Sequence, residues 1–231
     1  MTTVPAASPI VRRGLLLSAV ALVALAAVYV LAIGYTPIEA RQGPAQKIFY
    51  LHVPAAWSAL MAFSLVGLSS GLYLWLHDAR LDRFAAASAE VGVAFSAVML
   101  TTGPIWAKPI WGTWWTWDAR LTLTLFLFFL FIGYLALRAA LVDPAERARF
   151  SAVVGILGMI LVPFIHLSVY LFRTLHPQPV VLKPSAPSLP PAMLQTLLIS
   201  VAVFTLLYIG LVTTRYGIAL AEEARESPDA A

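Results

Sequence analysis

Six long runs of apolar residues, almost free of charge, divide this chain and constrain its fold more than any other feature. Each run can cross a hydrocarbon layer of roughly 30 Å, which takes about 20 helical residues at ~1.5 Å each. Hydrophobic residues make up 61% of the sequence and charged residues 11%, which is more apolar surface than a soluble core of this size can bury. The sequence therefore predicts an all-α polytopic membrane protein, a single integral membrane domain with six transmembrane helices at about 14–34, 55–76, 85–105, 121–141, 151–172 and 192–214.

The first apolar run resembles a signal peptide because Arg12 and Arg13 precede it. Its apolar stretch is longer than the roughly 7–15 residues of a signal-peptide core, so we expect a helix that is retained. Six crossings place both termini on the same side of the membrane. The intervening external loops are then expected at about 35–54, 106–120 and 173–191.

The distribution of lysine and arginine indicates which side faces the cytoplasm. Nine cations fall on the side of the termini and six on the other side, and cytoplasmic loops are the ones enriched in cations. We therefore predict cytoplasmic termini. The first group is Arg12, Arg13, Arg80, Arg83, Arg138, Arg147, Arg149, Arg215 and Arg225, and the second is Arg41, Lys47, Lys108, Arg120, Arg173 and Lys183.

Several function classes are excluded by what the sequence lacks. Without cysteine there is no thiolate ligation, no iron–sulfur cluster and no C-x-x-C-H site for covalent haem, so metal chemistry would use histidine or carboxylate. The cations are scattered through short loops, which argues against nucleic acid binding. No P-loop is present, so any ATP hydrolysis belongs to another subunit. The third external loop contains six prolines and is predicted to be stiff and extended, without regular helix or strand.

Five of the seven tryptophans lie within twelve residues of the second external loop, between Trp106 and Trp117. An interfacial aromatic belt is the common reason for tryptophan near helix ends, but a belt is spread over many ends and this cluster occupies one loop. We therefore interpret the cluster as a binding surface. If residues 111–118 are helical, Trp111, Trp114, Trp115 and Asp118 share one face, which would form a flat aromatic wall suited to a porphyrin.

Asp118 also has a simpler interpretation, as the N-cap of the fourth helix. Acidic groups on a flat ligand would need cations, and arginine binds a carboxylate through two hydrogen bonds. Arg120 and Arg173 are the best candidates, because they are nearest in sequence to the tryptophan loop and to His176.

Two of the four histidines flank the tryptophan loop on the same side of the membrane. His52 enters the second span and His176 leaves the fifth; they are either solvated surface groups or an axial pair for haem iron, of which neutral imidazole is a preferred ligand. His166 lies inside the fifth span, where it has either a functional role or a structural hydrogen bond. His77 is predicted to have no chemical role.

The segment from Trp111 to Thr122 (WGTWWTWDARLT) closely resembles the signature of the tryptophan-rich (WWD) haem-handling membrane proteins of cytochrome c maturation. Within that group the likeness is to the haem exporter protein C family. The segments from Tyr50 to Ala56 and from Thr174 to His176 are similar to the histidine-bearing external loops of the same family. The resemblance extends over nearly the whole chain, and the related cytochrome c synthetases are generally larger.

The resemblance implies that His52 and His176 are the axial ligands of haem b, carried as transient cargo, and that the tryptophan loop, including Trp117, is its platform. It implies location in the bacterial inner membrane with the haem site on the periplasmic face. The implied partners are a membrane-tethered haem chaperone, the ATPase and permease subunits of an ABC transporter, and a small single-helix subunit. The resemblance leaves open whether the chain catalyses haem attachment to the chaperone's histidine, as a haem lyase does, or only positions the reactants.

Two other classes remain. A b-type cytochrome would bury paired histidines between helices, whereas only His166 is clearly within a span. A permease or scaffold would need no haem, and its tryptophans would form an ordinary belt.

Overall fold

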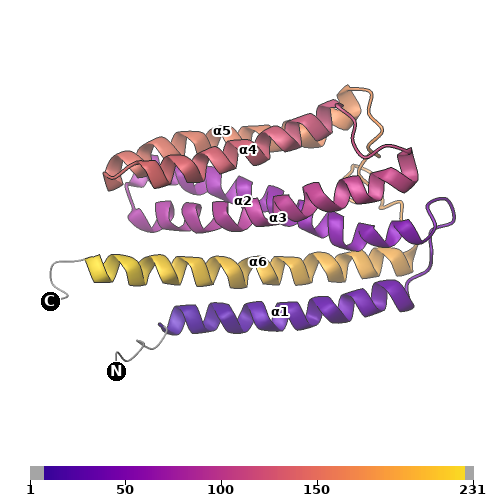
Figure 1. Cartoon of the computed structure of the whole chain (residues 1–231), viewed down its shortest axis with the longest axis horizontal. Helices are drawn as coiled ribbons and strands as arrows, with labels where there is room; N and C mark the ends of the chain where they lie inside the picture. The colour runs from indigo at the N-terminus through magenta and orange to yellow at the C-terminus, as the bar shows by residue number, and fades with distance from the viewer. Residues whose placement is uncertain (1–7, 227–231) are drawn as a thin grey trace.

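The computed structural model describes residues 8–226 and confirms an all-α architecture for that part of the chain. Six of its helices are long and apolar enough to cross a membrane (Figure 1). They are α1 (Pro9–Gly34), α2 (Phe49–Leu76), α3 (Ala79–Trp111), α4 (Ala119–Ala140), α5 (Pro144–Leu171) and α6 (Pro191–Glu226), and a short 3₁₀ helix, η1 (Pro44–Ile48), leads into α2.

The helices contain the predicted apolar spans almost entirely but continue beyond them. α3 begins at Ala79 rather than near residue 85 and ends at Trp111 rather than near residue 105. α6 continues to Glu226, well past the predicted end near residue 214. Hydropathy detects only the lipid-facing length, whereas backbone hydrogen bonding continues into charged segments. An ion pair between Arg83 and Glu223 links two of these extensions.

Aspartate residues begin three of the helices. Asp78, Asp118 and Asp143 each precede a helix, and each accepts a hydrogen bond from a backbone N–H in the first turn. Such caps satisfy amide groups that have no partner within the helix. At the other end of α3, Gly112 adopts φ +76°, a left-handed conformation that glycine tolerates and that ends the helix.

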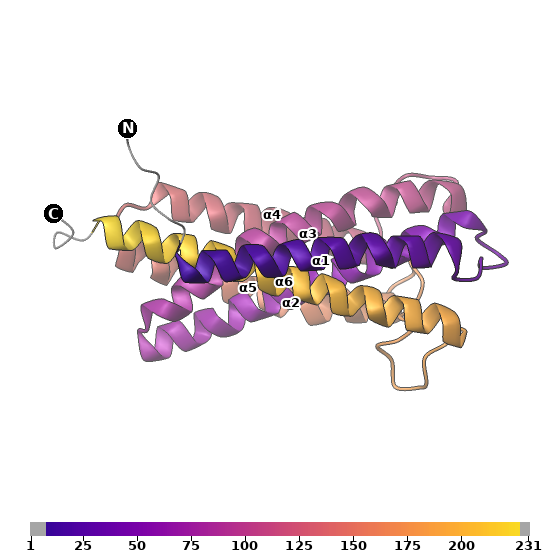
Figure 2. The ribbon, with the colours of Figure 1, turned by 90° about the horizontal axis from the view of Figure 1, so that it is seen from below.

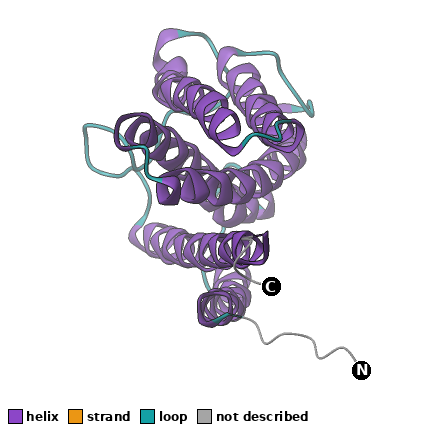
Figure 3. Cartoon of the chain, turned by 90° about the vertical axis from the view of Figure 1, so that its left-hand side faces the viewer, coloured by secondary structure: helices purple, strands orange, loops and turns teal. Residues whose placement is uncertain are grey.

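α2 packs against α3, α5 and α6 (Figure 1), whereas α1 packs mainly against α6, which lies behind it in Figure 2. Figure 3 shows the helices of the bundle end-on. Close contact between α1 and α6 depends on small residues. A Cβ atom at Gly210 of α6 would lie 2.7 Å from the backbone nitrogen of Ser18 of α1. Nearer the centre, the rings of Phe63 and Phe131 stack with their centroids 3.9 Å apart.

The two ends of the bundle differ in what they carry. α1 begins and α6 ends at one end, here called the terminal end, which also holds the α2–α3 and α4–α5 connections (Figure 1). The opposite end, here called the tryptophan end, carries η1 and the segments 112–118 and 172–190. In residues 8–226 every ion pair belongs to cations assigned to the terminal side: Arg80–Asp78, Arg83–Glu223, Arg138–Asp82 and Arg215–Glu90.

The proline-rich segment 172–190 has no regular helix or strand, as predicted. The expectation of an extended conformation was wrong, because the chain doubles back on itself. The N–H of Ser188 donates to the carbonyl of Val180 at 3.0 Å, and the residues between them form a projecting loop (Figure 2). Prolines fix φ locally, but the non-proline residues between them remain able to turn.

Candidate functional site

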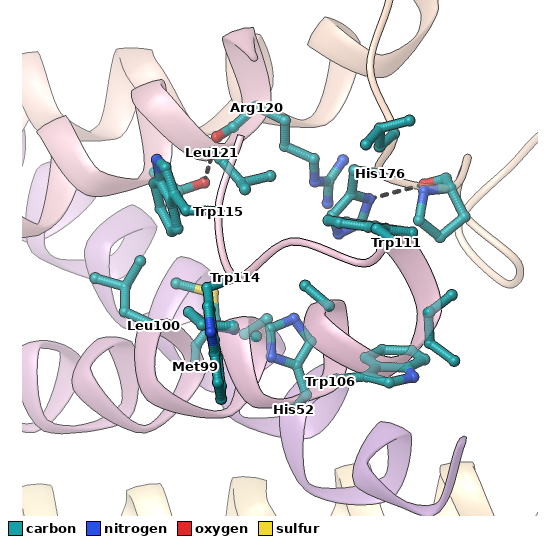
Figure 4. A pocket seen from close by; sticks show the side chains of 18 of the residues that line it. His52, Met99, Leu100, Trp106, Trp111, Trp114, Trp115, Arg120, Leu121 and His176 are labelled. Carbon is teal, nitrogen blue, oxygen red and sulfur yellow. Dashed lines mark hydrogen bonds between the residues drawn. The ribbon is translucent and has the colours of Figure 1, made fainter. Parts of the chain in front are cut away.

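A pocket opens at the tryptophan end between α2, α3, α4 and the segment 172–190 (Figure 4). It holds about 1030 Å³ of space, counted together with its open mouth. Its lining is mostly apolar and aromatic: Gln42, His52, Ala56, Leu60, Met99, Leu100, Gly103, Pro104, Trp106, Ala107, Ile110, Trp111, Trp114, Trp115, Arg120, Leu121, Thr124, Ile165, Leu175, His176 and Pro177.

His52 lies in the first turn of α2, not in a loop as the predicted boundary near residue 55 implied. The 3₁₀ turn of η1 feeds directly into α2 and brings the histidine inside the helix. Its Nδ1 lies 3.0 Å from the hydroxyl oxygen of Thr102 on α3. The edge of its ring meets Trp106 at a centroid distance of 5.8 Å, so two contacts from α3 hold the imidazole.

His176 reaches the pocket from the irregular segment 172–190 and lies on the opposite side from His52 (Figure 4). Its Nδ1 lies 2.9 Å from the carbonyl oxygen of Pro177. A carbonyl only accepts, so Nδ1 carries the proton and Nε2 keeps a free lone pair. Burial, together with the positive charge of Arg120, lowers the pKa of His176 from 6.5 to about 4. The imidazole is therefore neutral at neutral pH, as a metal ligand must be.

The segment 112–118 is not helical, so the predicted alignment of its aromatic residues on one helix face is wrong. The left-handed Gly112 ends α3, and the chain then crosses to α4 without regular structure. Trp114 lies beside His52, whereas Trp115 lies across the pocket beside Leu121 (Figure 4). Consecutive tryptophans therefore flank the space from two sides instead of forming one wall.

The remaining tryptophans have different positions. Trp111, the last residue of α3, lines the pocket and meets His176 edge-on at 6.4 Å. Trp117 is 77% exposed and does not line the pocket. Its ring packs edge-on against Trp115 at 5.9 Å, so it supports that ring from outside. Trp114 is 56% exposed, which places it at the open rim.

Asp118 is the N-cap of α4, the simpler of its two interpretations. Its carboxylate accepts hydrogen bonds from the backbone N–H of Leu121 at 3.0 Å and from the hydroxyl of Thr174 at 2.7 Å. The Thr174 oxygen in turn accepts from the backbone N–H of His176 at 3.0 Å. Asp118 does not line the pocket. Through Thr174 it connects the start of α4 to the segment that contains His176.

Of the two arginines predicted to meet acidic groups, only Arg120 lines the pocket. Its guanidinium points toward His176 and makes one long hydrogen bond, 3.4 Å, to the carbonyl of Ile165 (Figure 4). Most of its donors are therefore available to a ligand. Arg173 is exposed and lies outside the lining. His166 is half-buried, packs near Tyr170 on α5 and also lies outside the lining.

Sequence reasoning did not select several residues that shape the site. Thr102 and Gly103 contact or border His52, and Gln42 accepts a hydrogen bond from the indole N–H of Trp106 at 3.0 Å. A signal was present, because Thr101, Thr102 and Gly103 interrupt the apolar run just before the tryptophan segment.

Comparison with known proteins identifies the family of this chain. Residues 6–230 match the family described as CcmC, Heme exporter protein C. The chain is 39% identical over 219 residues to Heme exporter protein C of Bradyrhizobium diazoefficiens, covering 91% of this chain and 82% of the relative. It is 35% identical to the protein of the same name from Haemophilus influenzae, covering 85% and 80%, and 41% identical to that of Escherichia coli K12, covering 66% and 65%. Because the match covers nearly the whole chain, the chain belongs to the Heme exporter protein C family.

Proposed function

We propose that this protein binds haem in the pocket at the tryptophan end and passes it to another protein of cytochrome c maturation. The observation that carries the proposal is the placement of His52 and His176 on opposite sides of one aromatic, largely apolar pocket. Haem iron takes axial ligands above and below the porphyrin plane, and histidine is a common choice for both.

The chemistry of the other lining residues supports haem as the ligand. The flat, apolar macrocycle matches rings that flank the space from two sides, since ring faces contribute large buried areas. The haem propionates need cations, and Arg120 lies in the lining without a carboxylate partner among the described residues. Haem b is proposed as transient cargo because the chain has no cysteine for covalent attachment.

Transfer to a recipient, rather than permanent storage, is supported by the openness of the site. Trp114 at the rim is more than half exposed, and His176 is carried by an irregular segment. The recipient proposed from family membership is a membrane-tethered haem chaperone that receives haem through its own histidine. We further propose association with the ATPase and permease subunits of an ABC transporter and with a small single-helix subunit, in the bacterial inner membrane. The chain's lack of a P-loop is compatible with an external ATPase.

Single-histidine variants test the proposal. His52→Ala and His176→Ala are each expected to give a folded, inserted protein with an altered haem spectrum and little transfer to an apo-chaperone. Iron that loses one imidazole takes up water or becomes five-coordinate, so added imidazole should partly restore the six-coordinate spectrum. Absorption spectra and transfer assays on the purified proteins provide the measurement.

His166→Ala is the control, because this histidine lies outside the pocket lining. It is expected to keep the parental spectrum at a lower or equal protein level. If the His52 and His176 variants keep the parental spectrum while His166→Ala loses it, the proposed site is wrong.

A further inference from the structure

We propose that Thr102 is a positioning residue for haem, fixing the proton of His52 on Nδ1 so that Nε2 is left to bind iron. The inference rests on the proposed function. Thr102 reaches His52 from a different helix: its hydroxyl oxygen lies 3.0 Å from the Nδ1 atom, across the contact between α3 and α2.

The direction of this hydrogen bond follows from the other partner of the hydroxyl. A threonine hydroxyl has one proton, and the Thr102 hydroxyl lies 2.7 Å from the carbonyl of Val98, one turn earlier in α3. A carbonyl only accepts, so the proton points to Val98 and the oxygen is left as an acceptor. The Nδ1 of His52 must then donate its N–H to Thr102. In the neutral imidazole this leaves the lone pair on Nε2.

The surroundings of Thr102 hold this arrangement in place. Thr102 is 9% exposed, so water does not readily compete for its hydroxyl. The neighbouring Gly103 leaves room for the ring, since a Cβ atom there would lie 3.1 Å from Cε1 of His52. Trp106, one turn further along α3, meets the same ring edge-on. Three positions on one face of α3 therefore set the orientation of the imidazole.

A hydrogen-bond acceptor for Nδ1, the nitrogen that does not bind iron, has two consequences for the iron site. It fixes the tautomer and ring orientation, and it raises the basicity of the coordinating nitrogen; losing such a partner typically lowers metal affinity about 10–100-fold. A more basic ligand favours ferric over ferrous iron, so the hydrogen bond should lower the reduction potential of bound haem. For His176 the corresponding acceptor is the carbonyl of its own neighbour, Pro177.

The chain supplies a matched control one residue away. Thr101 makes the same helical hydrogen bond, to the carbonyl of Ala97 at 2.8 Å, but it is exposed and does not line the pocket. Thr102→Val and Thr101→Val remove the same hydroxyl while preserving side-chain shape. Thr102→Ser keeps the hydroxyl without the methyl group.

Haem titration and a spectroelectrochemical measurement of potential on the full-length purified variants form the test. Thr102→Val is expected to weaken haem binding about 10–100-fold and to raise the reduction potential, whereas Thr101→Val and Thr102→Ser keep both near the parental values. If Thr102→Val is poorly folded, Thr102→Ala is measured on its monodisperse fraction with the same expectation.

Unchanged affinity and potential in Thr102→Val or Thr102→Ala, or equal changes in Thr101→Val, would overturn the role of Thr102. The proposed function fails in a different way, through a parent protein that binds no haem or a His52→Ala variant with the parental spectrum. The two failures are therefore distinguishable.

Discussion

At the scale of single residues, the site is assembled by short polar links that join segments far apart in sequence. Asp118 binds Thr174, and Thr174 binds the backbone of His176. Gln42 accepts from Trp106, which itself packs against His52. The Asp118–Thr174 and Trp106–Gln42 links each join two distant parts of the chain, one near His176 and the other near His52.

Residue types and their side of the membrane allowed the histidine pair, the tryptophan cluster and Arg120 to be predicted from sequence. The link from Thr102 to His52 could not be predicted, because it depends on the rotation of α3 relative to α2. Hydroxyl groups inside helices usually bond their own backbone, and sequence does not distinguish Thr101 from Thr102 in this respect. Trp117 was predicted as part of the tryptophan loop and Arg173 by its proximity in sequence to His176, and the structure places both outside the pocket lining.

The tryptophans yield a prediction at this scale. Trp114→Ala and Trp115→Ala should each reduce haem retention, because each removes an aromatic face beside the ligand, worth about 0.5–1.5 kcal/mol beyond area burial. Trp75→Ala is the control: this residue is 77% exposed and lies near the other end of α2. The haem-to-protein ratio after purification is the measurement. Equal ratios in all three variants, at equal protein levels, would show that the cluster is only an interfacial belt.

At the scale of helices, hydropathy identified every membrane-spanning element but not how the elements end or pack. Because α3 ends at Gly112, the tryptophan segment 112–118 is an irregular connection to α4 and not one face of a helix. Aromatic residues at three- and four-residue spacing favour a helix in sequence analysis, yet the left-handed glycine and the Asp118 cap decide the local structure. Contacts between helices, such as that of α1 with α6, depend on small residues whose partners sequence alone does not specify.

The contact between α1 and α6 leads to a prediction about the stability of the helix bundle. In Gly210→Val the new Cβ would lie 2.7 Å from the backbone nitrogen of Ser18, so α1 has to move. Overpacking of this kind typically costs about 1–3 kcal/mol. The thermal unfolding midpoint in detergent should fall, whereas the haem spectrum should persist, because no residue of α1 lines the pocket.

Gly133→Val on α4 is the matched control, since nothing lies within 4 Å of a Cβ atom built there. Both substitutions put the same β-branched residue into a helix, so the difference between them isolates the steric contact. An equal loss of stability in the two variants would contradict the importance of the α1–α6 approach.

At the scale of the whole molecule, charge is divided unequally between the two ends. The tryptophan side carries six cations and two carboxylates, Glu39 and Asp118, both of which bind backbone amides. The terminal side carries nine cations, four of them in ion pairs. The excess positive charge therefore lies beside the pocket, where an acidic ligand or an acidic recipient would be attracted.

Two criteria for membrane orientation disagree for this charge distribution, so a measurement of orientation can decide between them. Net charge would place the tryptophan end in the cytoplasm, since its cations outnumber its carboxylates. The positive-inside rule counts lysine and arginine in short loops and gives acidic residues little weight, which favours a cytoplasmic terminal end by nine to six. We expect the second criterion to hold, with the pocket on the periplasmic face; the chain termini themselves lie outside the described residues.

Because the chain has no cysteine, single introduced thiols report orientation without background. Ser185→Cys in the segment 172–190 and Val142→Cys between α4 and α5 both replace exposed residues at opposite ends of the bundle. A membrane-impermeant maleimide applied to intact spheroplasts should label the first variant, and label the second only after permeabilisation. The reverse pattern would place the tryptophan end in the cytoplasm, where a periplasmic chaperone could not reach it. Labelling of both variants in intact cells would mean that the helices between them do not cross the membrane as arranged here.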